Sequence, residues 1–170
     1  ARSLASRLGR RWALVAACGS FGAEPMTVIA WDGHTLAADK LACNGWTRGT
    51  VTKIWRHGRE LLGVCGDLPI GLELRDWYAA GAVRPDFPAA NRDQDKGASL
   101  IVVKPNGEVW KYESGPIPFR VEGKFCAFGS GDEAALVAMH CGRTAAEAVG
   151  LASMVNTTCG NGIDALTIEA

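Results

Sequence analysis

Residues Thr27-Val-Ile-Ala-Trp-Asp-Gly-His-Thr-Leu-Ala-Ala-Asp39 form the strongest local pattern in the chain. Two runs of strand-forming residues, 27–31 and 35–39, flank the dipeptide Asp32-Gly33. Asp-Gly between two such runs is a favoured tight turn between antiparallel strands. The stretch therefore predicts a β-hairpin whose second strand ends, at Asp39, close to the start of the first.

The rest of the chain adds more hairpins and three helical segments. Further strands are predicted at 51–56, 60–65, 99–104, 108–112, 124–128 and 165–169. Helices are predicted at 70–80, 133–140 and 145–155, and the polar, Pro-containing residues 84–97 predict a loop. Antiparallel hairpins with grouped helices indicate an α+β fold. Two sheets packed face to face, with helices on the outside, would bury the small apolar residues of the last helix.

The overall composition is that of an ordinary folded domain. The chain has 170 residues, with 18 Lys or Arg and 18 Asp or Glu, so its formal net charge is zero. This balance excludes a strongly basic nucleic-acid binder and gives no support for a polybasic membrane patch. No apolar run approaches the ~20 residues that a membrane span needs. We therefore expect neither a nucleic acid nor a membrane as a partner.

The first 26 residues differ from the rest. Residues 1–25 hold four arginines and one acidic residue, Glu24, and a strand-like pattern begins abruptly after Pro25. We expect an upstream segment, 1–26, that is removed from a folded domain at 27–170. The segment fits a propeptide, a mis-called start or residues left from cloning better than it fits a secretion, lipidation or transit signal.

The six cysteines show no metal-binding pattern. No pair has CxxC spacing, and no His/Cys cluster has the spacing of a zinc site. A chain of this size with a full apolar core does not need disulfides. We expect reduced thiols in a cytoplasmic protein, with no metal and no other cofactor.

Four residues suggest hydrolytic chemistry. If the chain began at Met26, loss of that methionine would expose Thr27, whose hydroxyl can attack a carbonyl while the α-amine, with a pKa of ~8, takes the proton. Asp39 returns close to Thr27 in the hairpin, and Lys53, in an apolar run, needs a carboxylate partner. Gly66, between a strand and a helix, suits an oxyanion hole. Taken singly, each of these residues also fits an ordinary structural role.

From residue 27 onward the chain resembles proteasome β-subunits and the HslV peptidase, the threonine branch of the N-terminal-nucleophile hydrolases, and it looks closest to the compact bacterial proteasome homologues. The resemblance rests on six motifs in the family's order: Thr27-Val-Ile-Ala30, Leu36-Ala-Ala-Asp39, Val51-Thr-Lys-Ile54, Leu62-Gly-Val-Cys-Gly-Asp67, Ala127-Phe-Gly-Ser-Gly131 and Thr158-Cys-Gly-Asn-Gly-Ile163. Six motifs in the right order make the resemblance more specific than any one of them alone.

The resemblance implies a four-layer α-β-β-α sandwich of two antiparallel sheets. It also implies that Thr27 is both nucleophile and base, that Lys53 lowers the pKa of the amine, and that Asp39 holds Lys53. The Gly66 N–H would lie in the oxyanion hole, and Ser130 would assist proton transfer.

The same resemblance implies a self-compartmentalising threonine endopeptidase of the bacterial cytoplasm. Stacked homo-oligomeric rings of about 12–14 subunits would enclose a chamber in which polypeptide substrates are cut. The chain has no nucleotide-binding motif, so an ATP-dependent unfoldase would be a separate partner. By the same spacing, four residues would line the pocket for the residue before the cut and favour apolar side chains: Ala42, Val51, Trp55 and Val64.

Three positions depart from the family's pattern. Leu41 stands where the family often has Arg, and Asn156 and Cys159 stand where it often has Asp and Ser. An Asn does not supply the charge of an Asp, and retention of residues 1–26 would leave Thr27 without an α-amine. These points leave two alternatives, a catalytically inactive ring-forming scaffold and a small-molecule amidase on the same fold.

Overall fold

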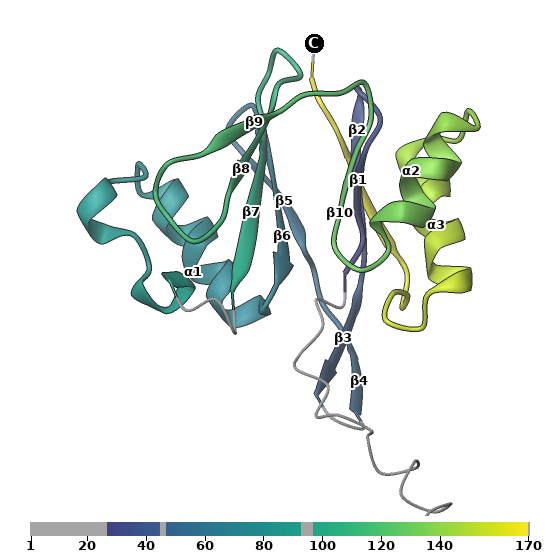
Figure 1. Ribbon diagram of the computed structural model, residues 1–170, viewed down its shortest axis with the longest axis horizontal. Coiled ribbons are helices and arrows are strands. Elements are labelled where there is room, and N and C mark those ends of the chain that lie inside the picture. The colour runs from purple at the N-terminus through teal and green to yellow at the C-terminus, as the bar shows by residue number, and fades with distance from the viewer. Residues whose placement is uncertain (1–26, 45–46, 93–96, 170) are drawn as a thin grey trace, which may run out of the picture.

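The computed structural model describes residues 27–44, 47–92 and 97–169. The upstream segment 1–26 lies outside these residues, so its separation from a domain at 27–170 stays a prediction. Within the described residues two antiparallel sheets lie face to face, and helices cover their outer sides (Figure 1).

Four strands form one sheet, in the order β10-β1-β2-β11. Their bounds are Ile29–Trp31 (β1), Thr35–Asp39 (β2), Cys126–Phe128 (β10) and Ile163–Thr167 (β11). The predicted first hairpin is present, with Ile29 opposite Ala38 and Trp31 opposite Leu36. β1 is therefore a central strand, flanked by β2 and β10.

Five strands form the other sheet, in the order β5-β6-β7-β8-β9, and all neighbours are antiparallel. Their bounds are Ile54–His57 (β5), Glu60–Gly66 (β6), Ala98–Val103 (β7), Val109–Tyr112 (β8) and Phe119–Val121 (β9). A separate hairpin of β3 (Leu41–Asn44) and β4 (Thr47–Thr50) follows β2.

Helices form the two outer layers. Helix α1 (Leu68–Ala79) packs on β6 and β7, whereas α2 (Asp132–His140) and α3 (Ala145–Val155) pack on the four-stranded sheet (Figure 1). The layers therefore run from α1 through the five-stranded and four-stranded sheets to α2 and α3. This is the α-β-β-α sandwich of an α+β fold that the sequence predicts.

Strand β1 is apolar along its whole length because both of its faces are buried. Ile29 and Trp31 belong to the core between the two sheets, whereas Ala30 packs in the core under α2 and α3. The helical side of that second core contains small residues such as Ala148 and Ala152. Small side chains allow the helix to approach the sheet closely, as the predicted burial of this helix requires.

Asp32 ties the first hairpin to the helical layer. Its Oδ1 accepts hydrogen bonds from the amides of His34 and Thr35, at 3.0 and 2.8 Å, and Gly33 closes the turn with a φ of +95°. Its Oδ2 accepts from the amide of Ala145, the first residue of α3, at 2.8 Å. One side chain therefore shapes the turn and fixes a helix on the sheet.

The elements differ from the predicted ones in several places, and the predicted loop at 84–97 contains two short 3₁₀ helices, Arg84–Asp86 and Ala89–Arg92. β5 begins at Ile54, so Val51 and Lys53 precede the strand instead of lying within it. β11 begins at Ile163, two residues before the predicted start. The β3–β4 hairpin and β9 are additional strands; β4 reads TRGT and is exposed along its length, so it carries no apolar alternation. None of the described helices is long and apolar enough to cross a membrane.

Candidate active site

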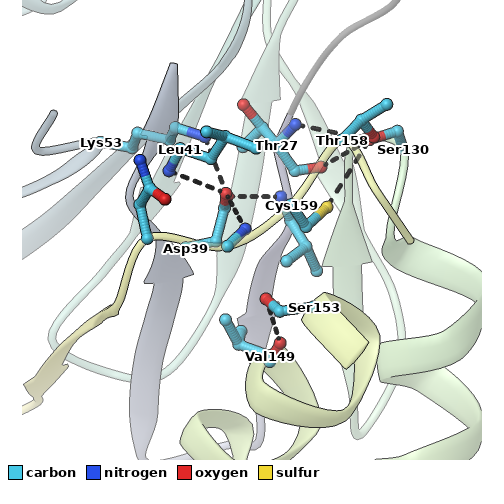
Figure 2. Close-up of polar contacts among 12 residues, drawn as sticks. Thr27, Asp39, Leu41, Lys53, Ser130, Val149, Ser153, Thr158 and Cys159 are labelled. Carbon is cyan, nitrogen blue, oxygen red and sulfur yellow. Dashed lines mark hydrogen bonds and ion pairs between the residues drawn. The ribbon is translucent and has the colours of Figure 1, made fainter. Parts of the chain in front are cut away.

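The Asp39 carboxylate is the centre of the candidate site. It is fully buried at the end of β2, and four donors of the described chain surround it (Figure 2). Oδ1 accepts from the Val28 amide and from Lys53 Nζ, both at 2.9 Å, and Oδ2 accepts from the amides of Leu41 at 3.1 Å and Gly160 at 3.0 Å. Both oxygens are engaged, so the carboxylate is fixed in one orientation.

The first hairpin places this carboxylate next to Thr27. Strand pairing continues beyond Ile29, because the Asp39 amide donates to the Val28 carbonyl at 3.1 Å. The Val28 amide in turn donates to the Asp39 side chain. Asp39 therefore lies opposite Val28, one residue from Thr27, where the turn at Asp32 predicts it.

Lys53 is a buried cation paired with Asp39. Its side chain is 3% exposed, and Nζ lies 2.9 Å from Oδ1. Burial lowers the pKa of the Lys53 ammonium below its ordinary value, and the charge of Asp39 and its hydrogen bond offset part of this shift. The segment is anchored on both sides, since Val51 donates its amide to the Lys40 carbonyl and Val64 donates to the Lys53 carbonyl, each at 2.9 Å. We call Asp39 and Lys53 the charged pair.

Thr27 lies between the charged pair and the turn at 129–131 (Figure 2). Its amide donates to Ser130 Oγ at 3.4 Å, and its carbonyl accepts from the Gly131 amide at 3.4 Å. Gly129 has a φ of +96°, and a Cβ added there would lie 2.2 Å from the Thr27 carbonyl oxygen. Only glycine fits this approach, so the Gly-Ser-Gly turn holds Thr27 as well as starting α2.

A neutral hydrogen-bond network lies on the other side of Thr27. Ser130 Oγ is 2.7 Å from Thr158 Oγ1, which is 2.6 Å from Asn156 Oδ1. Asn156 Oδ1 also accepts from the Thr158 amide at 2.9 Å, and Asn156 Nδ2 donates to the Ser130 carbonyl at 2.6 Å. These three residues, which we call the neutral network, join the loop after α3 to the turn before α2.

The three departures from the family's pattern all lie at this site. The Leu41 side chain is fully buried, and its backbone amide donates to Asp39. Cys159 is 2% exposed, its Sγ lies 3.7 Å from Ser130 Oγ, and burial raises the pKa of its thiol. Asn156 uses both a donor and an acceptor, a combination that a carboxylate does not offer.

Gly66 lies on the five-stranded sheet. It ends β6 with a φ of +101°, and a Cβ added there would lie 2.6 Å from the Gly97 carbonyl oxygen. Val64, two residues earlier on β6, donates its amide to the Lys53 carbonyl. This conformation explains the glycine at position 66, and its oxyanion role stays a prediction.

The four pocket candidates fall into two pairs. Ala42 and Val51 lie at the base of the β3–β4 hairpin, where Ala42 is opposite Gly49. Trp55 and Val64 lie on β5 and β6 and pack in the core beneath α1. Val64 is 1% exposed, so it offers little surface to a ligand. Their role in substrate binding stays a prediction.

Thr158 stands first in the motif at 158–163, but the sequence assigns it no role of its own in the site. The spacing Asn156-x-Thr158 is a usable signal, because Asn side chains commonly bond the backbone two residues further on. The backbone donors to Asp39 could not be identified without the fold. The described residues contain no group of three His, Cys, Asp or Glu side chains that could hold a metal ion. The site instead combines a hydroxyl nucleophile candidate, a buried cation and a network of hydroxyl and amide groups.

Comparison with known proteins identifies the fold. No protein-family model and no curated protein matches the chain. Among solved structures, BPH from Thiobacillus denitrificans in complex with epoxomicin is similar with a TM-score of 0.66 and 20% identity, over 84% of this chain and 98% of that one. Eukaryotic HslV from Trypanosoma brucei is similar with a TM-score of 0.63 and 18% identity, over 85% of this chain and 99% of that one. The chain therefore has the proteasome β-subunit/HslV-like fold that its sequence motifs predict.

Proposed function

We propose that the chain is a threonine peptidase that uses Thr27 as its N-terminal nucleophile. The observation that carries the proposal is the charged pair, a fully buried Asp39–Lys53 salt bridge positioned by the Val28 amide one residue from Thr27. A buried cation next to a threonine at the start of a central strand reduces stability, because burial removes its charge from water. Its charge favours the neutral form of a neighbouring amine at physiological pH, which a structural role does not require.

The proposed reaction begins when cleavage after Met26 releases the α-amine of Thr27. The Thr27 hydroxyl attacks the peptide carbonyl, and the amine takes the hydroxyl proton. The positive charge of Lys53 disfavours a second ammonium nearby and so lowers the pKa of that amine. The new C–O bond gives an oxyanion, which we assign to the Gly66 N–H. The C–N bond then breaks as the leaving amine takes the proton, and water hydrolyses the resulting ester.

Association of copies is part of the proposal. Helices α2 and α3 carry exposed apolar side chains on the outside of the sandwich: Val137, Leu151, Met154 and Val155. Exposed apolar side chains on these two helices support a protein–protein contact. We propose homo-oligomeric stacked rings of about 12–14 subunits, with polypeptide substrates and a separate ATP-dependent unfoldase as partners. Native mass spectrometry of the purified protein would measure the subunit number.

The experiment compares the parent with Thr27→Ala and Thr27→Ser. Intact mass should show a chain that begins at residue 27, and epoxomicin, which is bound in the Thiobacillus denitrificans BPH structure, is the probe. We expect a covalent adduct and peptide hydrolysis with the parent, reduced rates with Ser, and neither with Ala, because only Ala removes the nucleophilic oxygen.

The other outcomes identify the alternatives. Peptide hydrolysis by Thr27→Ala at the parent rate would contradict the proposal. Ring assembly without adduct or hydrolysis, in a chain that begins at residue 27, would indicate the inactive scaffold. Thr27-dependent hydrolysis of small amides but not of peptides would indicate the amidase. Peptides with apolar, basic or acidic residues before the cut would test the pocket prediction.

A further inference from the structure

We propose that Thr158 and Asn156 are positioning residues that fix the direction of the Ser130 hydroxyl proton, so that Ser130 Oγ accepts from the Thr27 nitrogen and leaves the lone pair of the amine to the attacking hydroxyl. This inference rests on the proposed function and adds to it the residues that orient the base.

Two backbone groups fix the orientation of the Asn156 amide. The Thr158 N–H can only donate, so the Asn156 atom at 2.9 Å from it must be the oxygen. The Ser130 carbonyl can only accept, so the Asn156 atom at 2.6 Å from it must be the nitrogen. The assignment of oxygen and nitrogen therefore does not depend on either hydroxyl group.

The amide orientation sets the direction of the hydroxyl bonds. Asn156 Oδ1 only accepts, so the Thr158 hydroxyl donates its single proton to it at 2.6 Å. Thr158 Oγ1 must then accept from Ser130 Oγ at 2.7 Å. Ser130 Oγ has two other possible acceptors for this proton, the Thr27 carbonyl at 3.4 Å and Cys159 Sγ at 3.7 Å. Both contacts compete weakly with the 2.7 Å bond to Thr158, because the first is long and sulfur is a weak acceptor. Toward the Thr27 nitrogen, also at 3.4 Å, the serine oxygen is left as an acceptor.

The direction matters because a neutral amine has one lone pair. If Ser130 donated its proton to that lone pair, the amine could not take the proton of the Thr27 hydroxyl. If Ser130 accepts an N–H instead, the lone pair remains available for the hydroxyl, and the ammonium that forms keeps a hydrogen-bond acceptor. A chain of three bonds that ends on an amide oxygen enforces the second arrangement.

Asparagine suits this role better than aspartate at position 156. A carboxylate would still accept from Thr158, but it would place an oxygen against the Ser130 carbonyl at the present 2.6 Å. The amide nitrogen turns that repulsion into a hydrogen bond. The departure from the family's pattern is thus matched by the neighbouring Thr158, which supplies a hydroxyl beside Ser130 while position 159 carries a thiol.

The test changes Thr158 and measures the α-amine of Thr27. Competitive labelling with acetic anhydride over a range of pH gives the pKa of this amine in assembled protein whose mass shows a chain that begins at residue 27. The test variant is Thr158→Val, which keeps the shape and removes the hydroxyl. Thr158→Ser is the rescue variant, and Thr157→Val, at an exposed threonine beside it, is the matched control.

We expect the amine pKa to fall in Thr158→Val. Without Thr158 Oγ1 the Ser130 proton turns to the amine lone pair, which stabilises the neutral amine. The acid limb of the pH profile for peptide hydrolysis should therefore move to lower pH, while kcat falls about 10-fold and KM changes little, since proton transfer is impaired and binding is not. Thr158→Ser and Thr157→Val should keep the parent values.

The charged and titratable groups near this point stay in place in every variant. Cys159 in the loop after α3 lies beside Ser130, and Asp132 follows the turn at the start of α2. Asp39 on β2 and Lys53 before β5 act electrostatically on Cys159, and Cys65 on β6 acts on Lys53. A shift confined to Thr158→Val is therefore due to the hydroxyl.

Each outcome has a distinct meaning. An unchanged amine pKa in Thr158→Val, or a lower kcat with an unmoved acid limb, would overturn the inference and leave the peptidase proposal standing. A shifted amine pKa in a protein without Thr27-dependent hydrolysis would retain the inferred orientation and overturn the peptidase proposal. A chain that keeps residues 1–26 overturns both, because an amide nitrogen has no basic lone pair. If Thr158→Val does not assemble, Thr158→Ala gives the same comparison with a smaller side chain.

Discussion

The two sides of Thr27 are built from different chemistry. On one side the charged pair is 0% and 3% exposed, and backbone amides from three segments of the chain complete its hydrogen bonds. On the other side the neutral network is partly buried and joins two loops through hydroxyl and amide groups. The charged pair can act on Thr27 through its electric field, and the neutral network can fix the direction of a hydroxyl proton.

This difference predicts how substitutions on each side change stability and activity. A buried charge that loses its partner stays desolvated and uncompensated, so the whole structure is affected. A neutral hydroxyl or amide that loses its partner has a smaller desolvation penalty and can turn to another acceptor. Changes on the charged side should therefore reduce stability first, and changes on the neutral side should reduce activity first.

The largest expected effect is that of Asp39→Ala. It removes the carboxylate that pairs with Lys53 and leaves the amides of Val28, Leu41 and Gly160 without this acceptor. Loss of one partner of a buried ion pair costs about 3–5 kcal/mol of unfolding free energy. Urea unfolding at one fixed protein concentration measures it, since assembly also contributes to stability.

The matched variant for that comparison is Asn156→Ala on the neutral side. This variant should lose only about 1–3 kcal/mol of unfolding free energy, the usual penalty for unsatisfied neutral groups. Equal losses in the two variants would mean that the charged pair has no special place in the stability of the fold.

A smaller effect is expected where the backbone of the neutral side meets Thr27. Gly129→Ala forces an unfavourable φ of +96°, which costs about 1–3 kcal/mol, and it pushes a methyl group to 2.2 Å from the Thr27 carbonyl oxygen. Displacing the nucleophile by about 1 Å should lower hydrolysis by roughly 100-fold.

Gly107→Ala is the control that separates the effect of backbone strain from the effect of displacing Thr27. Gly107 has a φ of +84° with open space around it, so alanine there carries the strain alone. We expect it to lose stability and keep the parent's rate of peptide hydrolysis. If Gly129→Ala also kept that rate, the turn would not position Thr27.

The sequence was more informative about the charged side than about the neutral side, for a physical reason. Asp39 and Thr27 are brought together by a local turn whose residues, Asp32-Gly33, have a strong preference for that geometry. Lys53 in an apolar run demands a carboxylate, so one half of the pair predicts the other. Both inferences use short-range rules, although the sequence pattern predicts a strand that starts at 51, whereas β5 starts at Ile54.

The neutral side could be predicted only in part. The resemblance gives Ser130 a role but gives Thr158 none, because a neutral hydroxyl has many acceptable partners and nothing in its neighbourhood requires a particular one. From the sequence Asn156 is a missing charge, whereas in the structure its amide nitrogen donates to the Ser130 carbonyl. The β3–β4 hairpin escaped prediction for a related reason, since its exposed strand carries no apolar alternation.

The smallest expected effect is a pH dependence of stability that only the charged side should show. The pKa of Lys53 is lowered in the folded chain and returns to 10.5 on unfolding. Between the folded value and 10.5 the unfolded chain binds more protons, so stability rises with pH through this window. Below the window both states are protonated, and the contribution of Lys53 does not change.

Lys53→Met should abolish that rise. The quantity to measure is the difference in unfolding free energy between parent and Lys53→Met, which cancels the titration of the cysteines and tyrosines common to both. The difference should shift in favour of the parent as pH approaches 10.5. The matched control is Lys40→Met, because Lys40 pairs with Asp164 near the surface, where both side chains are in contact with solvent. A difference that stays constant across the window would mean that the charge of Asp39 fully offsets the effect of burial on the Lys53 pKa. In that case the electric field proposed to act on the Thr27 amine would have to be larger than the lowered lysine pKa implies.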